Sequence, residues 1–352
     1  MVFAFDSDIA VRTAWWTGAI SVLLAVLVMF QIILLRTTLV WRRRRVALLH
    51  AEWEPRLVES LERVPENLPR VARIDRFELM LLWNYMQESL RDEAVENLNA
   101  VARLIKLDRY ALNLLKHKNL RKKLLAIQTL GWLRQQSAWE KLLAITNSGD
   151  PILSLCGARA LMRIDAARAL TFVLPMIARR DDWSYSMIGG MLKDAGADVI
   201  SEPLAHIVLM LPVDQARRMI RLLELCHPQA VVPSIRKLLS GSAELEIVTG
   251  CLRILQDPED LPVVRAFLKD ERWQIRLQAA ACLGKIGTPE DISMLAHACG
   301  DLEWWVRYRA AQALEHLPFV SAERLKNIAD NHQNEFARDI IRQVIAERMV
   351  SE

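Results

Sequence analysis

The stretch PEDLPVVRAFLKDERWQIRLQAAACLGKI at residues 258–286 returns at residues 289–317 as PEDISMLAHACGDLEWWVRYRAAQALEHL. The shift that places Pro258 on Pro289, which we call the repeat shift, aligns nine identical positions, among them Arg276 with Arg307. Nine of the twenty mismatched positions exchange one apolar residue for another. The chain therefore contains an internal repeat, and this repeat decides the fold.

Each repeat unit is predicted to be a pair of antiparallel helices. Pro-Glu-Asp suits a helix start, because Pro fits the first helical position and acidic side chains favour the positive end of the helix dipole. Asp270 or Asp301 then marks the turn into the second helix. The spacing recurs more weakly upstream and is irregular near 181–240, and about seven units fit between residues 119 and 345. One helix pair cannot bury its apolar face alone, so we expect an all-α fold in which 119–345 form a right-handed α-solenoid.

The pattern D-x-x-W-x-[IV]-R-x-x-A-A-x-x-L at 270–283 and 301–314 resembles HEAT repeats, specifically those of phycobilisome-lyase-type HEAT proteins. This resemblance implies that Arg276 and Arg307 form a ladder of ion pairs with acidic turn residues of adjacent units. The whole layout also resembles bacterial membrane-anchored HEAT-repeat proteins. Some of those are encoded beside membrane glycosyltransferases of polysaccharide synthesis.

An apolar segment near the N-terminus predicts a membrane anchor. Residues 13–35 contain no charged side chain, and as a helix they would extend about 34 Å, enough to cross a hydrocarbon core of roughly 30 Å. Acidic residues precede the segment and four arginines follow it, the reverse of the order in a cleaved signal peptide. The positive-inside rule then places the remainder in the cytoplasm of a bacterial cell, as a single-pass inner-membrane protein. We expect a short extracytoplasmic N-terminus (1–12), a transmembrane anchor (13–41), an arginine-rich flank (42–45), a helical linker or N-terminal cap (46–118) and the solenoid (119–345).

Small residues follow one side of the predicted anchor. Their spacing of i, i+4, i+7 and i+11 puts Ala14, Gly18, Ser21 and Ala25 on one helix face. Such a stripe lets two helices approach closely in lipid, so it is a candidate for packing against another transmembrane helix. Small residues are also common in membrane helices that bind no partner.

Basic residues gather in two places. The formal charge of +4 is local, because the segment 36–45 alone carries five arginines. A second cluster at 103–123 holds eight basic residues against Asp108. We predict that this cluster faces anionic lipid, an acidic partner or solvent. Nucleic-acid binding is disfavoured because residues 46–352 together carry no net formal charge. The candidate membrane-surface residues are Arg42, Arg43, Arg44, Arg45, Lys116, Lys118, Arg121, Lys122 and Lys123.

Motifs of known chemistry are missing from the sequence. Its histidines and cysteines do not take the spacing of a zinc site, and no nucleotide-binding or nucleophile motif is present. The repeat shift relates Cys251 to Cys282, which predicts small core residues in successive units. We therefore expect no metal, no cofactor and no small-molecule substrate. The alternative is a lyase- or transferase-like enzyme that uses the concave groove of the solenoid.

Positions that differ between units, while the repeat frame is kept, are candidates for partner contact. Comparison of 273–286 with 304–317 selects Trp305, Tyr308, Arg309, Gln312 and Glu315. Three of these, Tyr308, Gln312 and Glu315, are predicted to share one exposed helix face on the concave side. The alternative is an end-of-array surface that binds nothing. The sequence thus predicts a membrane-tethered scaffold or adaptor for a protein partner. The resemblance to anchored HEAT-repeat proteins suggests a glycosyltransferase of polysaccharide synthesis as that partner.

Overall fold

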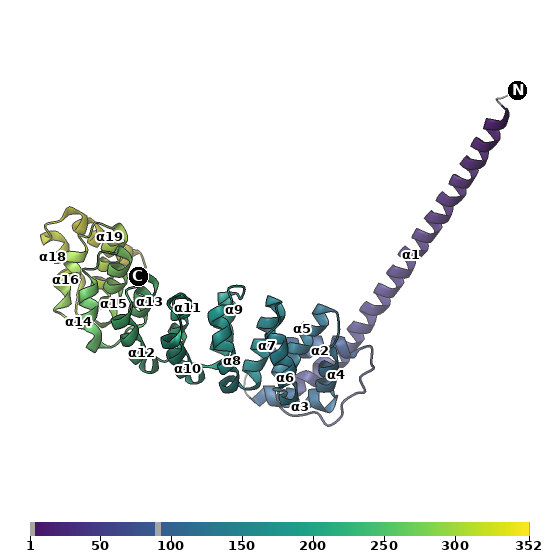
Figure 1. Cartoon of the computed structure of the whole chain (residues 1–352), viewed down its shortest axis with the longest axis horizontal. Coiled ribbons are helices and arrows are strands. Elements are labelled where there is room, and N and C mark those ends of the chain that lie inside the picture. The colour runs from purple at the N-terminus through teal and green to yellow at the C-terminus, as the bar shows by residue number, and fades with distance from the viewer. Residues whose placement is uncertain (1–3, 89–92, 352) are drawn as a thin grey trace. The chain divides into compact units, whose positions relative to one another are not determined.

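The computed structural model describes residues 4–88 and 93–351, and every regular element in those ranges is a helix (Figure 1). This confirms the all-α prediction. The chain forms two compact units, Met1–Trp139 and Glu140–Glu352. The predicted solenoid start at residue 119 falls inside the first unit.

The first unit is built around one long helix. Helix α1 (Ala4–Glu59) extends for about 84 Å at 1.5 Å per residue. Its part from Trp15 is long and apolar enough to cross a membrane, with a mean hydropathy of 2.7 in its most apolar window. The helix continues without a break from the predicted anchor into the predicted linker. The helices that follow are α2 (Arg76–Glu88), α3 (Glu93–Leu104), α4 (Leu107–Leu114) and α5 (Leu120–Trp132).

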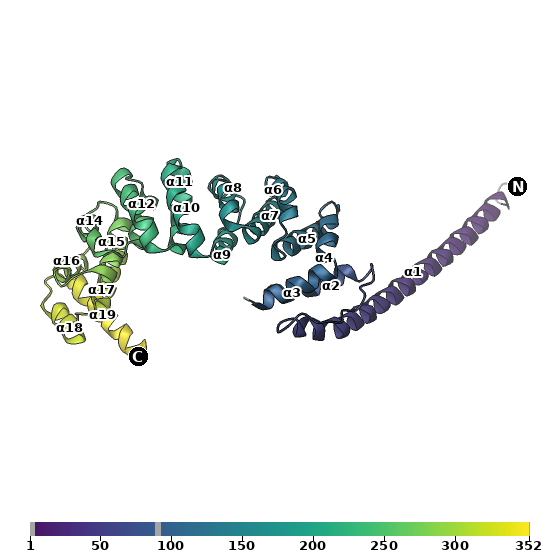
Figure 2. The ribbon, with the colours of Figure 1, turned by 90° about the horizontal axis from the view of Figure 1, so that it is seen from below.

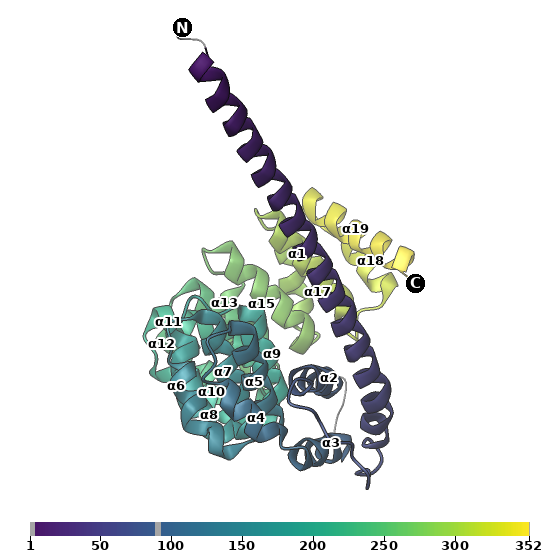
Figure 3. The same ribbon diagram turned by 90° about the vertical axis from the view of Figure 1, so that its right-hand side faces the viewer.

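Helix α2 lies between α1 and α5, as both Figure 2 and Figure 3 show. The end of α1 that packs on α2 buries Leu49, Trp53 and Leu57, which are spaced four residues apart on one face. On its other side, α2 is tied to α5 by Asn84, which donates to the Thr129 hydroxyl at 2.7 Å. Because both groups are buried, this bond fixes how the two helices align.

The second unit is a run of helices joined by short turns. Its helices are α6 (Trp139–Thr146), α7 (Pro151–Ile164), α8 (Ala166–Arg179), α9 (Tyr185–Ala195), α10 (Ala197–Met210), α11 (Val213–Met219), α12 (Pro228–Gly241), α13 (Leu245–Ile254), α14 (Leu261–Phe267), α15 (Trp273–Ile286), α16 (Asp291–Ala298), α17 (Trp304–His316), α18 (Ala322–Asn331) and α19 (Glu335–Ser351).

The C-terminal half of this unit follows the predicted helix pairs. Helices α12 and α13, α14 and α15, α16 and α17, and α18 and α19 pack within pairs. Between pairs, α13 packs on α15, α15 on α17 and α17 on α19. The paired alanines 279–280 and 310–311 are fully buried at these contacts. Cys251 and Cys282 are also buried, as the repeat shift predicts. The fold is therefore solenoid-like in this region.

Two local features differ from the simplest repeat. Helix α11 is short and continues as a 3-10 helix over Ile220–Leu225, within the segment whose repeat spacing is irregular. Pro258–Asp260 is likewise a 3-10 turn, so α14 starts at Leu261, later than the Pro-Glu-Asp motif predicts. The reason is that Asp257 accepts from the backbone N–H of Glu259 and closes a separate turn before the α-helix begins.

Candidate functional site

An exposed apolar patch lies where the chain turns into α17. Leu302 is 95% exposed, Trp305 is 57% exposed and Trp304 is 40% exposed. The turn is held by Asp301, whose carboxylate accepts from the backbone N–H of Glu303 at 2.9 Å. We call Leu302, Trp304 and Trp305 the end patch. Three large apolar side chains so close together on a surface are typical of a binding site.

Comparison of repeat positions shows that the end patch is a local departure from the preceding unit. Under the repeat shift, Leu302 corresponds to Glu271 and Trp305 corresponds to Gln274. The same shift relates Trp305 to Phe336, which is the second residue of α19 and is 63% exposed. An exposed aromatic residue therefore occupies one repeat position in two successive units. The comparison of 273–286 with 304–317 misses both Leu302 and Phe336. Starting it a few residues earlier would have included Leu302, and adding the next unit would have included Phe336.

Aromatic contacts order the end patch. The Trp304 ring stacks on Tyr308, with centroids 5.1 Å apart and planes 8° from parallel. Trp305 meets Trp304 edge to face at 4.7 Å. Such pairs hold rings in place before any partner arrives, which lowers the entropy that binding must remove.

The predicted exposed face of α17 is partly covered by α19. Tyr308 donates its hydroxyl to Glu347 at 2.8 Å, and Arg348 lies 3.0 Å from the Glu315 carboxylate. Tyr308 is half-buried, and the Glu315 side chain is only 17% exposed. The hydrogen bond with Glu347 raises the pKa of Tyr308 above its ordinary value. These two side chains are therefore less open than the sequence predicted, because the chain itself uses them to hold α19.

The other predicted partner residues are more accessible. Arg309 is exposed and donates to the half-buried Gln312 at 3.1 Å, while Trp305 belongs to the end patch. Of the five predicted residues, Trp305 and Arg309 thus remain open to a partner.

Arginines join successive units, as the resemblance to HEAT repeats implies. Arg276 binds Asp301 through two parallel bonds of 2.7 and 2.9 Å. Arg307 differs, because its guanidinium lies over the Phe336 ring, 5.1 Å from the centroid, and donates to the carbonyl of Asp301. Under the repeat shift Asp301 corresponds to His332, so the next unit offers no carboxylate at that position.

A second set of ion pairs was not predicted. Arg236 donates to Asp260 at 2.6 Å, and Arg265 holds Asp291 with bonds of 2.5 and 3.0 Å. Both aspartates end the Pro-Glu-Asp motifs and are buried. They therefore connect neighbouring units, in addition to any effect on the helix dipole.

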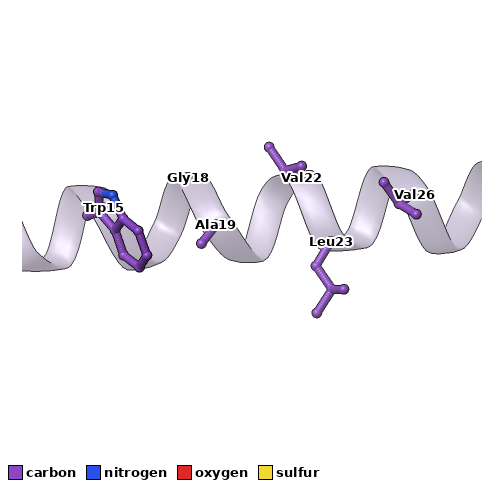
Figure 4. Close-up of a pocket in the computed structure, with 6 residues that line it drawn as sticks. All are labelled: Trp15, Gly18, Ala19, Val22, Leu23 and Val26. Carbon is purple, nitrogen blue, oxygen red and sulfur yellow. The ribbon is translucent and has the colours of Figure 1, made fainter.

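The small-residue stripe of α1 lies on an exposed surface. Gly18, Ser21 and Ala25 are exposed, whereas the side chain of Ala14 lies outside the described part of the chain. Beside the stripe, a shallow recess is lined by Trp15, Gly18, Ala19, Val22, Leu23 and Val26 (Figure 4). The recess and the stripe share only Gly18, where a Cβ atom would meet open space.

The predicted membrane-surface residues occupy two places in the first unit. Arg42 and Arg45 are bound by carboxylates of Glu78 and Asp75, and Arg43 and Arg44 are exposed. The remaining five lie at the turn between α4 and α5 and in the first turn of α5. There Lys116, Lys118 and Arg121 are exposed, and Lys122 and Lys123 are half-buried.

The second unit also has a surface recess, which is a candidate for the groove of the enzyme alternative. It is lined by Leu268, Lys269, Ser293, Met294, His297, Ala298, Gly300 and Asp301. In this recess the Asp301 carboxylate is already bound by Arg276. The buried thiols of the unit lie outside the residues that line the recess, and burial raises the pKa of Cys251, Cys282 and Cys299 to about 12. In the part of the chain that the structure describes, no three metal-binding side chains come together.

The fold and the ion-pair ladder define an all-helical repeat protein, and comparison with known proteins gives the type of repeat. Residues 245–315 match the model of the family described as HEAT repeats, which places HEAT repeats in α13 through α17. No curated protein matches the chain. HEAT repeats commonly mediate protein–protein interaction, and this region includes the end patch and therefore suggests a role as an interaction scaffold.

Proposed function

We propose that the protein is a non-enzymatic scaffold, tethered to a membrane by α1, whose HEAT-repeat region binds a protein partner through the end patch. One observation carries this proposal. Leu302 and Trp305 are exposed and apolar at repeat positions where the preceding unit has Glu271 and Gln274. Exposed apolar side chains of this size have no role in stacking the repeats, and they fit a surface that a partner buries.

The chemistry of the end patch suits a protein partner. Tryptophan and arginine are the side chains that most often dominate binding free energy at protein interfaces, and Trp305 and Arg309 lie four residues apart on α17. Truncating a central tryptophan of an interface costs about 2 kcal/mol or more, a factor of about 30 in Kd. We expect Trp305 to have this effect and Arg309 to contribute at the rim.

The membrane part of the proposal rests on α1. Its apolar segment is followed by four arginines, which favours an orientation with the helical units in the cytoplasm of a bacterial inner membrane. A chain held there encounters other membrane proteins first. The glycosyltransferases of polysaccharide synthesis are the first class to test, because of the resemblance to anchored HEAT-repeat proteins.

The experiment identifies the partner and then measures binding. A photo-crosslinking amino acid at position 305 of the full chain would capture the neighbour in intact membranes, and mass spectrometry would identify it. Binding of that purified partner would then be compared between the wild type and the double variant Leu302→Glu, Trp305→Gln. These substitutions place at 302 and 305 the polar residues that the preceding unit carries, so we expect the repeat fold to tolerate them.

A matched control removes exposed apolar side chains elsewhere in the second unit. Met210→Gln and Val213→Gln change two exposed residues at the junction of α10 and α11. We expect at least a tenfold weaker affinity for the end-patch variant and an unchanged affinity for the control. Equal affinity in both variants would reject the end patch as the site, and a chain that captures no partner stoichiometrically would argue against a scaffold.

A further inference from the structure

The start of α2 is attached to the part of α1 that follows the predicted membrane span. Asp75 accepts two bonds from Arg45, of 2.6 and 2.9 Å, and Glu78 accepts one from Arg42 at 2.7 Å. Both arginines lie within four residues of Trp41, where the predicted anchor ends. The first turn of α2 is therefore held next to the point at which α1 leaves the membrane.

The same turn of α2 is in contact with the start of α5. The Phe77 ring lies under the ammonium group of Lys122, with 5.9 Å from nitrogen to centroid. Asn119 caps α5 by accepting from the backbone N–H of Lys122, which orders the turn that carries Lys116 and Lys118. Since α2 contacts both α1 and α5, the start of α5 and the turn before it are linked through Phe77 and Glu78 to the part of α1 at Arg42.

Charge accounting shows that this turn, more than the arginine flank, is available to a membrane surface. Two of the four flanking arginines are bound by carboxylates, so the flank with Asp75 and Glu78 keeps a net charge of +2 (four minus two). By contrast, no ion pair within 4–88 and 93–351 includes Lys116, Lys118, Arg121, Lys122 or Lys123. We call these five residues the basic turn.

We infer that the basic turn binds the headgroups of anionic phospholipids in the leaflet from which α1 emerges, an inference that rests on the proposed membrane anchor. Attraction between a lysine and an anionic leaflet decays within a Debye length of about 8 Å at physiological salt. Only basic residues held close to the leaflet contribute, and the contacts of Asp75, Glu78 and Phe77 provide that closeness. The bound lipids hold the first unit against the membrane and limit its swing about α1.

The test measures how accessible the lysines are. The full chain would be reconstituted into nanodiscs of phosphatidylcholine alone and of phosphatidylcholine mixed with phosphatidylglycerol, without any partner protein. Acetylation by an N-hydroxysuccinimide ester, read by mass spectrometry, gives the labelling rate of each lysine. We expect Lys116 and Lys118 to be labelled several-fold more slowly in the anionic nanodiscs, and high salt to restore the rate. Lys193 and Lys237, which are exposed in the second unit, serve as internal references.

Two variants of equal charge change complete the test. Lys118→Glu with Arg121→Glu should abolish the protection of Lys116, whereas Lys269→Glu with Lys326→Glu should leave it intact. Equal labelling of Lys116 in both kinds of nanodisc would overturn the inference. Protection that occurs in native membranes and is missing from anionic nanodiscs would also overturn it and would assign the basic turn to an acidic protein. Because no partner is present, a failure here leaves partner binding by the end patch unaffected.

Discussion

Gly284 of α15 lies against the backbone of Ala313 in α17, so closely that a Cβ atom at residue 284 would stand 2.9 Å from both Cα and Cβ of Ala313. We expect Gly284→Ala to force α15 and α17 apart. Overpacking of this kind costs about 2 kcal/mol and outweighs the gain of about 1 kcal/mol from better helix propensity. Urea unfolding of the full chain in detergent micelles, followed by far-UV circular dichroism, would measure the loss.

The control for this prediction is the same substitution where space is open. Gly190 is exposed inside α9, and a Cβ atom there would meet nothing within 4 Å. Gly190→Ala should therefore stabilise the second unit by up to about 1 kcal/mol. If both variants shifted the unfolding midpoint in the same direction, close approach of α15 and α17 would not be the reason for glycine at position 284.

A buried ion pair gives the second prediction. Asp291 is fully buried and is held by Arg265, so Arg265→Ala leaves a carboxylate whose remaining side-chain and backbone bonds come from Thr288. Removal of one partner of such a pair costs about 3 kcal/mol. The exposed pair of Arg342 and Asp330 is the control, and Arg342→Ala should cost less than about 1 kcal/mol. Similar losses in both variants would show that burial of Asp291 does not determine the effect.

The aspartates of the two ladders predict acid sensitivity. Burial is the largest single effect on the pKa of Asp291 and of Asp301 and raises both values. The hydrogen bonds from Arg265 and Arg276, together with backbone hydrogen bonds and the attraction of the guanidinium charges, outweigh burial, so both pKa values lie below the ordinary value. The unfolded chain then binds protons more readily than the folded chain. The stabilisation is fully present above the unfolded pKa of about 3.9 and is lost as the pH falls through the folded pKa.

Urea midpoints measured from neutral pH downward should therefore fall steeply below about pH 4. The fall should be shallower in Arg265→Ala, because Asp291 loses its main partner in that variant. A midpoint that does not change with acid would contradict the role given to these carboxylates.

The sequence predicted the helix pairs well and the contacts between adjacent pairs poorly. The repeat shift located the pairs of 258–317, and the resemblance implied the bond between Arg276 and Asp301. The ion pairs of Arg236 with Asp260 and of Arg265 with Asp291 were not predicted. The repeat shift relates Asp260 to Asp291 but relates Arg236 to Phe267, so no single shift relates one pair to the other. These arginines lie in α12 and α14, each the first helix of its pair. Contacts between such helices depend on how the units stack, and a one-dimensional pattern does not contain that information.

The cover over Tyr308 shows the same limit. A repeat comparison identifies equivalent positions, but the next unit decides which of them stay open. Beyond residue 317 the pattern fades, and Trp304 corresponds to Glu335. Glu347 and Arg348 of α19 therefore could not be recognised as the residues that cover α17.

This cover leads to a fourth prediction. Glu347→Gln keeps the shape of the side chain and removes its charge, so the pKa of Tyr308 should fall towards its ordinary value. Titration of tyrosine absorbance, with a Tyr308→Phe chain to identify the signal, would measure the change. Hydrogen exchange should also become faster at the end of α19, while α16 stays unchanged. An unaltered Tyr308 titration would mean that the bond to Glu347 does not persist in solution.

The cysteines provide the last prediction, which bears on the enzyme alternative. Burial raises the pKa of Cys226 to about 11 and that of Cys251 and Cys282 to about 12, and thiols react as thiolates. We expect iodoacetamide to modify the half-buried Cys156 first at neutral pH and the buried thiols only after denaturation. Mass spectrometry of tryptic peptides, sampled over time, would give the order. Rapid modification of Cys251 or Cys282 in the folded chain would indicate an activated thiol and would favour a catalytic groove over a scaffold.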